Sequence, residues 1–211
     1  MQSTEFAALI KSRRSIRNWQ DKPVPEQVLL DAVELATWAP NGGNRQNWRF
    51  FLVLNRNTIK ALSDAVQAGA GGPRPAPPPG SPPPAPRAPL SSAPAVIAIG
   101  TTRNINPQEE AMAKQALTDP KAAAALKALA AVDTPIQSIA AAITTLLLAL
   151  HQAGLGAVWM CGPLTHCKGE FERILKVPPG MDIVAYIPVG YPAESPTKDR
   201  KPVSEVCQII H

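Results

Sequence analysis

The sequence predicts an α+β fold in which a mixed β-sheet is flanked by helices. Short runs of aromatic and β-branched residues, which are typical of strands, occur at 48–54, 95–99 and 181–189. Between them lie segments with apolar residues at helical spacing, of which 134–153 is the longest. That segment is apolar nearly all round, so we expect it to be buried on every side, within one subunit or between two.

Length, charge and cysteine content restrict the class of protein. The chain has 211 residues, which predicts a single domain over 1–211. Its net charge of +5 is modest and its basic residues are mostly scattered, which argues against nucleic-acid binding. Three cysteines without a CxxC pair indicate a reducing compartment. Because the N-terminus lacks a signal-peptide core and the apolar run 136–150 is shorter than the ~20 residues of a membrane span, we expect a cytoplasmic protein.

Helices are predicted at 5–12 and 57–67, on either side of the first strand. Another helix begins near Glu26, after two prolines, and ends before Pro40. The next segment, 73–94, contains 11 prolines in 22 residues, which excludes a helix or an inner strand. We interpret it as a surface linker or loop insertion in polyproline II or disordered form, with a docking site for a proline-binding module as the alternative.

The C-terminal half begins with the strand 95–99, which we expect to end at Gly100. Alanine-rich helices are predicted at 107–117 and 121–131. Residues Thr134 to Gln137 form a capping-box pattern with proline at the first helical position, and the long apolar helix then runs to Gly154. The strand at 181–189 is ended by a Gly-Tyr-Pro turn.

Two polar stretches near the N-terminus carry the candidate chemistry. The first is basic, and its guanidinium groups suit a phosphate. The second is a loop of amides and glycines, which can bring backbone close to a flat ligand and hydrogen-bond its polar edge. Together they indicate a phosphorylated, planar, heteroaromatic ligand. The candidate residues are Arg13, Arg14, Ser15 and Arg17 in the first stretch and Pro40, Asn41, Gly42, Asn44 and Gln46 in the second.

In the order and spacing of these motifs, the chain resembles the FMN-dependent nitroreductase family. That family's N-terminal signature is a basic pair, a serine and a further basic residue, then a helix, then Ala-Pro, an Asn, a Gln and a Trp. The Gly-Leu-Gly at 154–156, followed by a strand and a turn, resembles its second landmark, and Lys198-Asp199-Arg200 resembles its third. The resemblance covers nearly the whole chain except 70–94 and 103–131. The proline-rich tract is a departure from the family.

The resemblance implies FMN as the cofactor, NAD(P)H as the reductant and a small electron-poor acceptor such as a nitroaromatic or a quinone. It assigns Arg13, Lys198 and Arg200 to the flavin phosphate and Arg17 to the pyrimidine edge of the flavin. Relatives use the amide loop partly across a homodimer interface, which the long apolar helix would form, and the segment at 103–131 covers their active site. The turn at Met160, Cys161 and Gly162 would border the flavin, with the backbone N–H of residue 161 directed to N5.

Other interpretations compete with this one. An FMN-dependent dehydrogenase or oxidase of a tailoring pathway would take hydride from a bound substrate, and a scaffold would use the proline tract while its flavin site is vestigial. Cys161, His166 and Cys167 suggest a metal site, but their spacing is not a standard zinc spacing. The serine and asparagines could be cap and turn residues instead. The four tryptophans, Trp19, Trp38, Trp48 and Trp159, are expected in the core.

Overall fold

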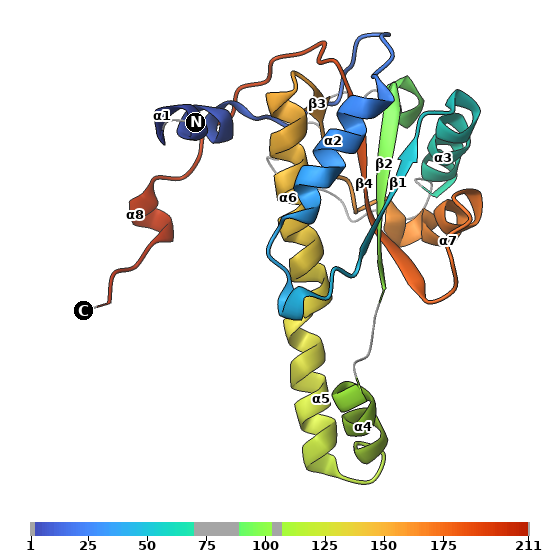
Figure 1. Cartoon of the computed structure of the whole chain (residues 1–211), viewed down its shortest axis with the longest axis vertical. Helices are drawn as coiled ribbons and strands as arrows, with labels where there is room; N and C mark the ends of the chain where they lie inside the picture. The colour runs from blue at the N-terminus through green and yellow to red at the C-terminus, as the bar shows by residue number, and fades with distance from the viewer. Residues whose placement is uncertain (1–2, 70–88, 103–106, 211) are drawn as a thin grey trace, which may run out of the picture.

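The computed structural model describes residues 3–69, 89–102 and 107–210, and it has the predicted α+β class (Figure 1). Four strands form one sheet in the order β1-β2-β4-β3. The four strands pair antiparallel, and a parallel pairing occurs at the isolated bridge between Ser15 and Ala157. In chain order, the elements are α1 (Ser3–Ser12), α2 (Glu26–Thr37), η1 (Gly42–Asn44), β1 (Trp48–Val53), α3 (Arg56–Gly69), η2 (Leu90–Ser92), β2 (Ala95–Thr102), α4 (Pro107–Gln115), α5 (Pro120–Val132), α6 (Thr134–Gln152), β3 (Gly156–Ala157), α7 (Leu164–Ile174), β4 (Met181–Gly190) and α8 (Val203–Val206).

Helices cover both faces of the sheet. Helices α2 and α6 lie on one face, and α3 and α7 lie on the other (Figure 1). Because side chains alternate along a strand, Ile97 and Ile99 of β2 pack toward α2 and α6, whereas Val96 and Ala98 pack toward α3 and α7. The core therefore has two parts, one on each side of the central strand.

Strand β2 continues beyond Gly100, where the sequence predicted its end. A register shift occurs at this point, since Ile99 lies opposite Ala185 and Gly100 lies opposite Ile183. A Cβ atom on Gly100 would lie 2.8 Å from the Sδ atom of Met181. Glycine is therefore used here for a close approach inside the sheet, not to end the strand.

The N-cap of helix α6 lies one residue earlier than the sequence predicted. Asp133, not Thr134, is the N-cap, and its carboxylate accepts a hydrogen bond from the backbone N–H of Ile136 (3.2 Å). The side chain of Gln137 donates to the carbonyl of Val132 and not back to the cap residue. A carboxylate next to the first turn also interacts favourably with the helix dipole, and this explains why aspartate replaces the predicted threonine in the role.

One side of α6 is buried within the chain and the other is partly exposed. Ile139, Ile143, Leu146 and Leu150 are buried against α2 and the sheet, whereas Thr144 on the opposite side is exposed. The run Pro120–Gln152 is long and apolar enough to span a membrane by length and composition. Its α6 half buries one side in the core of the domain.

Helices α7 and α8 and the short 3-10 turns η1 and η2 were not predicted. Helix α7 buries Leu164, Cys167 and Phe171 on one side, so two of the three residues that suggested a metal site, His166 and Cys167, belong to an ordinary amphipathic helix. At the end of the proline-rich segment, Leu90 is buried in the core between α3 and α7. The last residues of 73–94 are thus an anchored part of the fold with a short 3-10 turn, whereas residues 73–88 lie outside the described residues.

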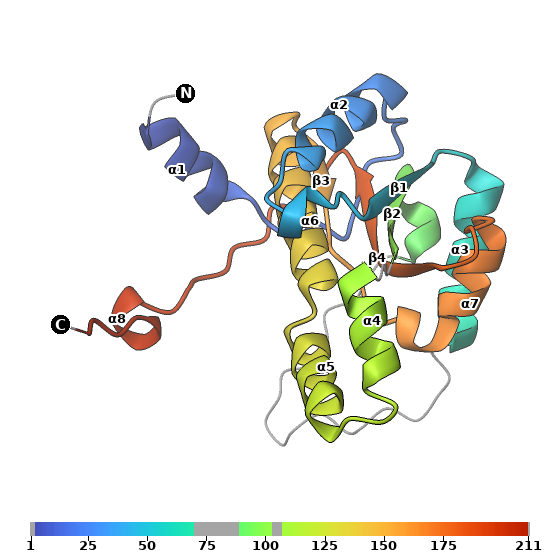
Figure 2. The same ribbon diagram turned by 60° about the horizontal axis from the view of Figure 1, so that its bottom comes forward.

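Three parts of the chain extend from this body. Helix α1 and the C-terminal arm with α8 extend away on one side, and α4 and α5 form a hairpin beyond the lower end of α6 (Figure 1, Figure 2). The arm ends in apolar side chains that stand in solvent, with Ile210 87% exposed. Trp38, at the end of α2, is 81% exposed and Trp159 is also exposed, so these two tryptophans are not in the core of the single chain.

Candidate functional site

The basic stretch lies in an extended segment that runs along the edge of the sheet. The backbone N–H of Ile16 donates to the carbonyl of Ala157 (3.1 Å), and Trp19 forms an antiparallel bridge with Pro192. A Cβ atom on Gly156 would lie 2.7 Å from Ile16, so the glycine allows this close approach. The predicted Gly-Leu-Gly landmark and the predicted basic stretch are therefore direct neighbours in space.

The extended backbone separates the basic residues onto two sides. Arg17 and Trp19 line a cavity of about 220 Å³ that is also lined by Gln67, Leu90 and Met160. The alternation of an extended chain directs Ser15 to the same side as Arg17 and Arg14 to the other. The Arg17 cavity brings together two predicted site residues, Arg17 and Met160, that are far apart in sequence.

Arg14 and Ile16 line a different cavity, of about 380 Å³. Arg14 donates to the carbonyls of Lys11 (2.5 Å) and Arg13 (2.9 Å), and its buried Nε atom has no hydrogen-bond partner among the described residues. His151, also in this wall, lies 2.8 Å from the hydroxyl of Ser12. Burial lowers the pKa of His151, and the positive charges of Arg13 and Arg14 lower it further, so the imidazole is neutral at pH 7.

Arg200 of the third landmark interacts electrostatically with Arg13 of the basic stretch. Burial lowers the pKa of Arg13, and the positive charge of Arg200 is the next largest cause, followed by that of Arg14. Arg200 therefore lies close to Arg13, although 187 positions separate them in the sequence. Lys198 and Arg200 are exposed. Guanidinium groups that repel one another at a partly buried position form a suitable place for an anion with several oxygen atoms.

The amide loop is held in a strained conformation. Gly43, Asn44 and Gln46 have φ angles of 63°, 50° and 46°, all in the left-handed region. The backbone N–H of Gln46 donates to the side chain of Asn41 (3.0 Å), and that of Gly42 donates to the hydroxyl of Ser138 in α6 (3.2 Å). Non-glycine residues with positive φ cost energy and often occur where a loop must present particular groups.

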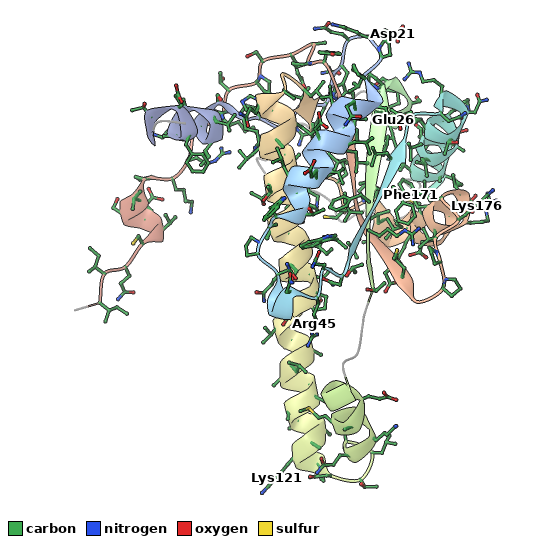
Figure 3. The ribbon with its side chains drawn as sticks, viewed as in Figure 1. Asp21, Glu26, Arg45, Lys121, Phe171 and Lys176 are labelled. Atoms are coloured by element: carbon green, nitrogen blue, oxygen red, sulfur yellow. The ribbon has the colours of Figure 1, made fainter. Side chains whose placement is uncertain are left out.

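The amide loop and the basic segment do not meet within one chain. Helix α2 lies between them, and its 12 residues at about 1.5 Å each span roughly 18 Å. Figure 3 shows Glu26 at one end of this helix and Arg45 of the loop beyond the other. The small cavity beside the loop is lined by Gly42, Thr134 and Ser138 among others, not by the basic segment. The single chain thus contains two separate halves of the predicted site.

The turn after β3 lies at the mouth of the Arg17 cavity. Met160 exchanges two backbone hydrogen bonds with Tyr186 of β4, at 3.0 and 2.9 Å, and this fixes the turn. Cys161 and Gly162 follow and are exposed. Cys167 is buried in α7, and burial raises the pKa of its thiol. Among the described residues, no group of three His, Cys, Asp or Glu side chains could hold a metal ion.

One residue of this region was not singled out from the sequence. Glu194 accepts hydrogen bonds from the basic segment, at the backbone of Arg17 and Asn18. Its position between the Gly-Tyr-Pro turn and Lys198 could have drawn attention, because it is the one acid among 190–198. Spacing alone does not reveal that this carboxylate reaches residues near the N-terminus.

Comparison with known proteins identifies the family. The model of the nitroreductase family matches residues 10–191, and the chain therefore belongs to that family. It is 32% identical over 182 residues to the NADH dehydrogenase of Thermus thermophilus, covering 86% of this chain and 84% of the relative.

Solved structures have the same fold. A BluB-like flavoprotein from Clostridium difficile superposes with a TM-score of 0.77 at 18% identity, covering 100% of both chains. An FMN complex of a proposed nitroreductase from Desulfovibrio desulfuricans superposes with a TM-score of 0.67 at 22% identity, covering 97% of this chain and 96% of that chain.

Proposed function

We propose that the protein is an FMN-dependent NAD(P)H oxidoreductase that reduces electron-poor acceptors such as nitroaromatics or quinones. One observation carries the proposal: the fold brings three sequence landmarks together in pairs, with the charge of Arg200 acting on Arg13, and with Arg17 and Met160 lining one cavity. The names of the Thermus relative and of the Desulfovibrio complex support the reductant and the cofactor. The chemistry that FMN supplies when bound is transfer of a hydride equivalent from NAD(P)H to the acceptor.

The residues present fit such a cofactor. Arg13, Lys198 and Arg200 would hold the terminal phosphate, with Ser15 as a further donor. Arg17 would stabilise negative charge at the pyrimidine edge, and its Nε atom is buried without a hydrogen-bond partner in the described structure. The backbone at Met160, Cys161 and Gly162 would border the ring. Arg14 points to the other side of the segment, so we expect it to contribute charge to the site rather than direct contact.

We also propose that the working unit is a homodimer. The amide loop from Pro40 to Gln46 cannot reach the basic segment of its own chain, so a second copy would supply it. Ile136 of α6, Leu35 of α2 and Trp38 directly after α2 are exposed apolar side chains, which such a copy would cover. The apolar side chains of the C-terminal arm are also exposed, and the second copy would cover them as well. Each flavin site would then contain residues of both subunits.

Absorbance of the purified protein tests the cofactor directly. We expect a yellow protein whose heat-released cofactor is FMN by mass spectrometry, because the cation cluster suits one terminal phosphate. NAD(P)H should bleach the bound flavin under anaerobic conditions. A flavin that NAD(P)H does not bleach would favour the tailoring dehydrogenase or oxidase, and a colourless protein that does not take up FMN would favour the scaffold. The three cysteines are unpaired, which supports the predicted cytoplasmic location.

Cys161→Ala should keep most of the NAD(P)H-driven flavin reduction. The proposed contact at this position is the backbone N–H, which alanine retains, whereas a thiol is a weak donor. Anaerobic stopped flow at saturating FMN measures the rate. A drop of more than about a hundredfold, or ~2.7 kcal/mol of barrier, would assign the chemistry to the thiol instead.

Gln46→Gly should stabilise the fold and weaken FMN binding. Gln46 has a φ angle of 46°, and relieving a left-handed conformation contributes about 1 kcal/mol of stability. The same change at Lys176, with a φ angle of 52° at the end of α7, is the matched control. Both variants should resist urea better, but only Gln46→Gly should lose FMN affinity. If both bind FMN like the unchanged protein, the side chain of Gln46 does not contact the flavin.

A further inference from the structure

Glu194 joins the two parts of the chain that carry the cation cluster. Its Oε1 atom accepts hydrogen bonds from the backbone N–H groups of Arg17 (2.5 Å) and Asn18 (3.1 Å). Its Oε2 atom accepts one from the side-chain amide of Asn18 (2.9 Å). Both oxygen atoms are thus used, and all three donors belong to the N-terminal basic segment. Hydrogen bonds to an ionised carboxylate are about twice as strong as neutral ones.

Residues 18–20 and 191–193 pair through backbone hydrogen bonds, and the Glu194 carboxylate continues this pairing by one residue, to Arg17. The N–H of Gln20 donates to the carbonyl of Tyr191 (2.9 Å), and the N–H of Ala193 donates to that of Asn18 (3.0 Å). Beyond this point the C-terminal chain continues through residues 195–197 to the cations of the third landmark. Glu194 therefore ties the C-terminal chain to the basic segment four residues before Lys198.

The carboxyl group of Glu194 stays ionised in this position. Burial alone would raise the pKa of the carboxyl group, but the hydrogen bonds from the backbone of Arg17 and from Asn18, and the positive charge of Arg17, lower it below its ordinary value. The group is ionised at neutral pH, and it interacts electrostatically with Arg17. It can thus act on the site in two ways, by fixing the backbone of the basic segment and by partly offsetting the charge of Arg17.

We propose that Glu194 is a positioning residue that fixes the basic segment at Arg17 to the chain carrying Lys198 and Arg200, and that it tempers the charge of Arg17 on the flavin. The second half of this proposal rests on the proposed function. The first half concerns the protein without cofactor and can be tested on its own. Glu194 takes no direct part in the flavin reaction, because both of its carboxylate oxygens already accept hydrogen bonds from N–H donors.

Hydrogen exchange measured on the FMN-free protein tests the connection between the segments. Glu194→Ala should increase exchange in peptides covering both 13–20 and 191–200, because each segment loses its contact with the other. Glu170→Ala is the matched control, since Glu170 is an exposed carboxylate paired with Arg173 on α7. Unchanged exchange in both peptides would overturn the proposal. Should Glu194→Ala fail to fold, Glu194→Gln replaces it, because glutamine keeps the volume and one acceptor.

Flavin measurements then test the electrostatic role. Glu194→Ala should weaken FMN binding at least tenfold in a fluorescence titration. Glu194→Gln should make the midpoint potential of bound FMN more positive, because Arg17 then stabilises the anionic reduced flavin without an opposing charge. An unchanged potential and affinity would overturn this part, since a purely structural contact predicts that result. Failure of the unchanged protein to bind FMN would reject the proposed function, while the exchange result would still decide the connection.

Discussion

Replacing Arg13 or Arg200 by alanine should weaken FMN binding by about ten- to a hundredfold, since a hydrogen bond to a charged group contributes roughly 1.5–3 kcal/mol. The positive charge of Arg200 lowers the pKa of Arg13, after burial, so these two cations interact unfavourably without a bound anion. A phosphate relieves that repulsion. The stability of the FMN-free protein should not fall with its affinity, because removing one cation also removes repulsion.

Fluorescence titration of FMN at two salt concentrations measures this effect. The affinity of the unchanged protein should fall at high salt, because salt screens the attraction between the cations and the phosphate. Arg173→Ala on α7 is the control, since Arg173 is an exposed arginine paired with Glu170 outside the site. If Arg13→Ala and Arg200→Ala both bind FMN like Arg173→Ala, neither arginine contacts the phosphate.

Thr144→Arg should convert the proposed homodimer into monomers. Thr144 is exposed on the outer side of α6, so arginine fits the single chain without changing its core. In the proposed dimer the same side chain would be a buried charge without a partner, which costs several kcal/mol. The monomer would also lose the amide loop of the second copy, so FMN affinity should fall together with the dimer.

Sedimentation of the flavin-loaded protein measures this result. Asn57→Arg is the matched control, because Asn57 is exposed on α3, on the opposite face of the sheet. It should leave the dimer and the flavin unchanged. A flavin-bound monomer of the unchanged protein, or a Thr144→Arg dimer, would show that α6 does not form the interface.

Much of the fold was predictable because its signals are local. The helix near Glu26 has its prolines, its acidic first turn and its apolar spacing within 15 residues, and β1 and β4 are rich in β-branched and aromatic residues. Helix α7 was missed although Leu164, Cys167 and Phe171 have helical spacing, because Gly169 and the polar residues between them weaken the pattern. The continuation of β2 through Gly100 depends on Met181 in another strand, and the burial of Leu90 depends on α3 and α7. No local pattern contains that information.

The site was predictable in its parts but not in its assembly. The sequence motifs selected Arg13 and Arg200, which the structure brings together, and Arg17 and Met160, which share a cavity. Arg14 lines a different cavity from Arg17, because the backbone between them is extended and its register is set by Ala157. The distance between the amide loop and the basic segment follows from how α2 packs on α6. Both are properties of tertiary packing.

The pairing of the basic segment with the chain around Glu194 sets the order in which the protein can mature. Glu194 lies 176 positions after Asn18 and 177 positions after Arg17, so these hydrogen bonds close one of the longest loops in the molecule. Contacts between distant positions form slowly, and a growing chain folds from its N-terminus. The basic segment is therefore made well before residues 191–194, with which it pairs. The cation cluster can be complete only after Arg200 has been made, and uptake of the proposed cofactor would have to follow that step.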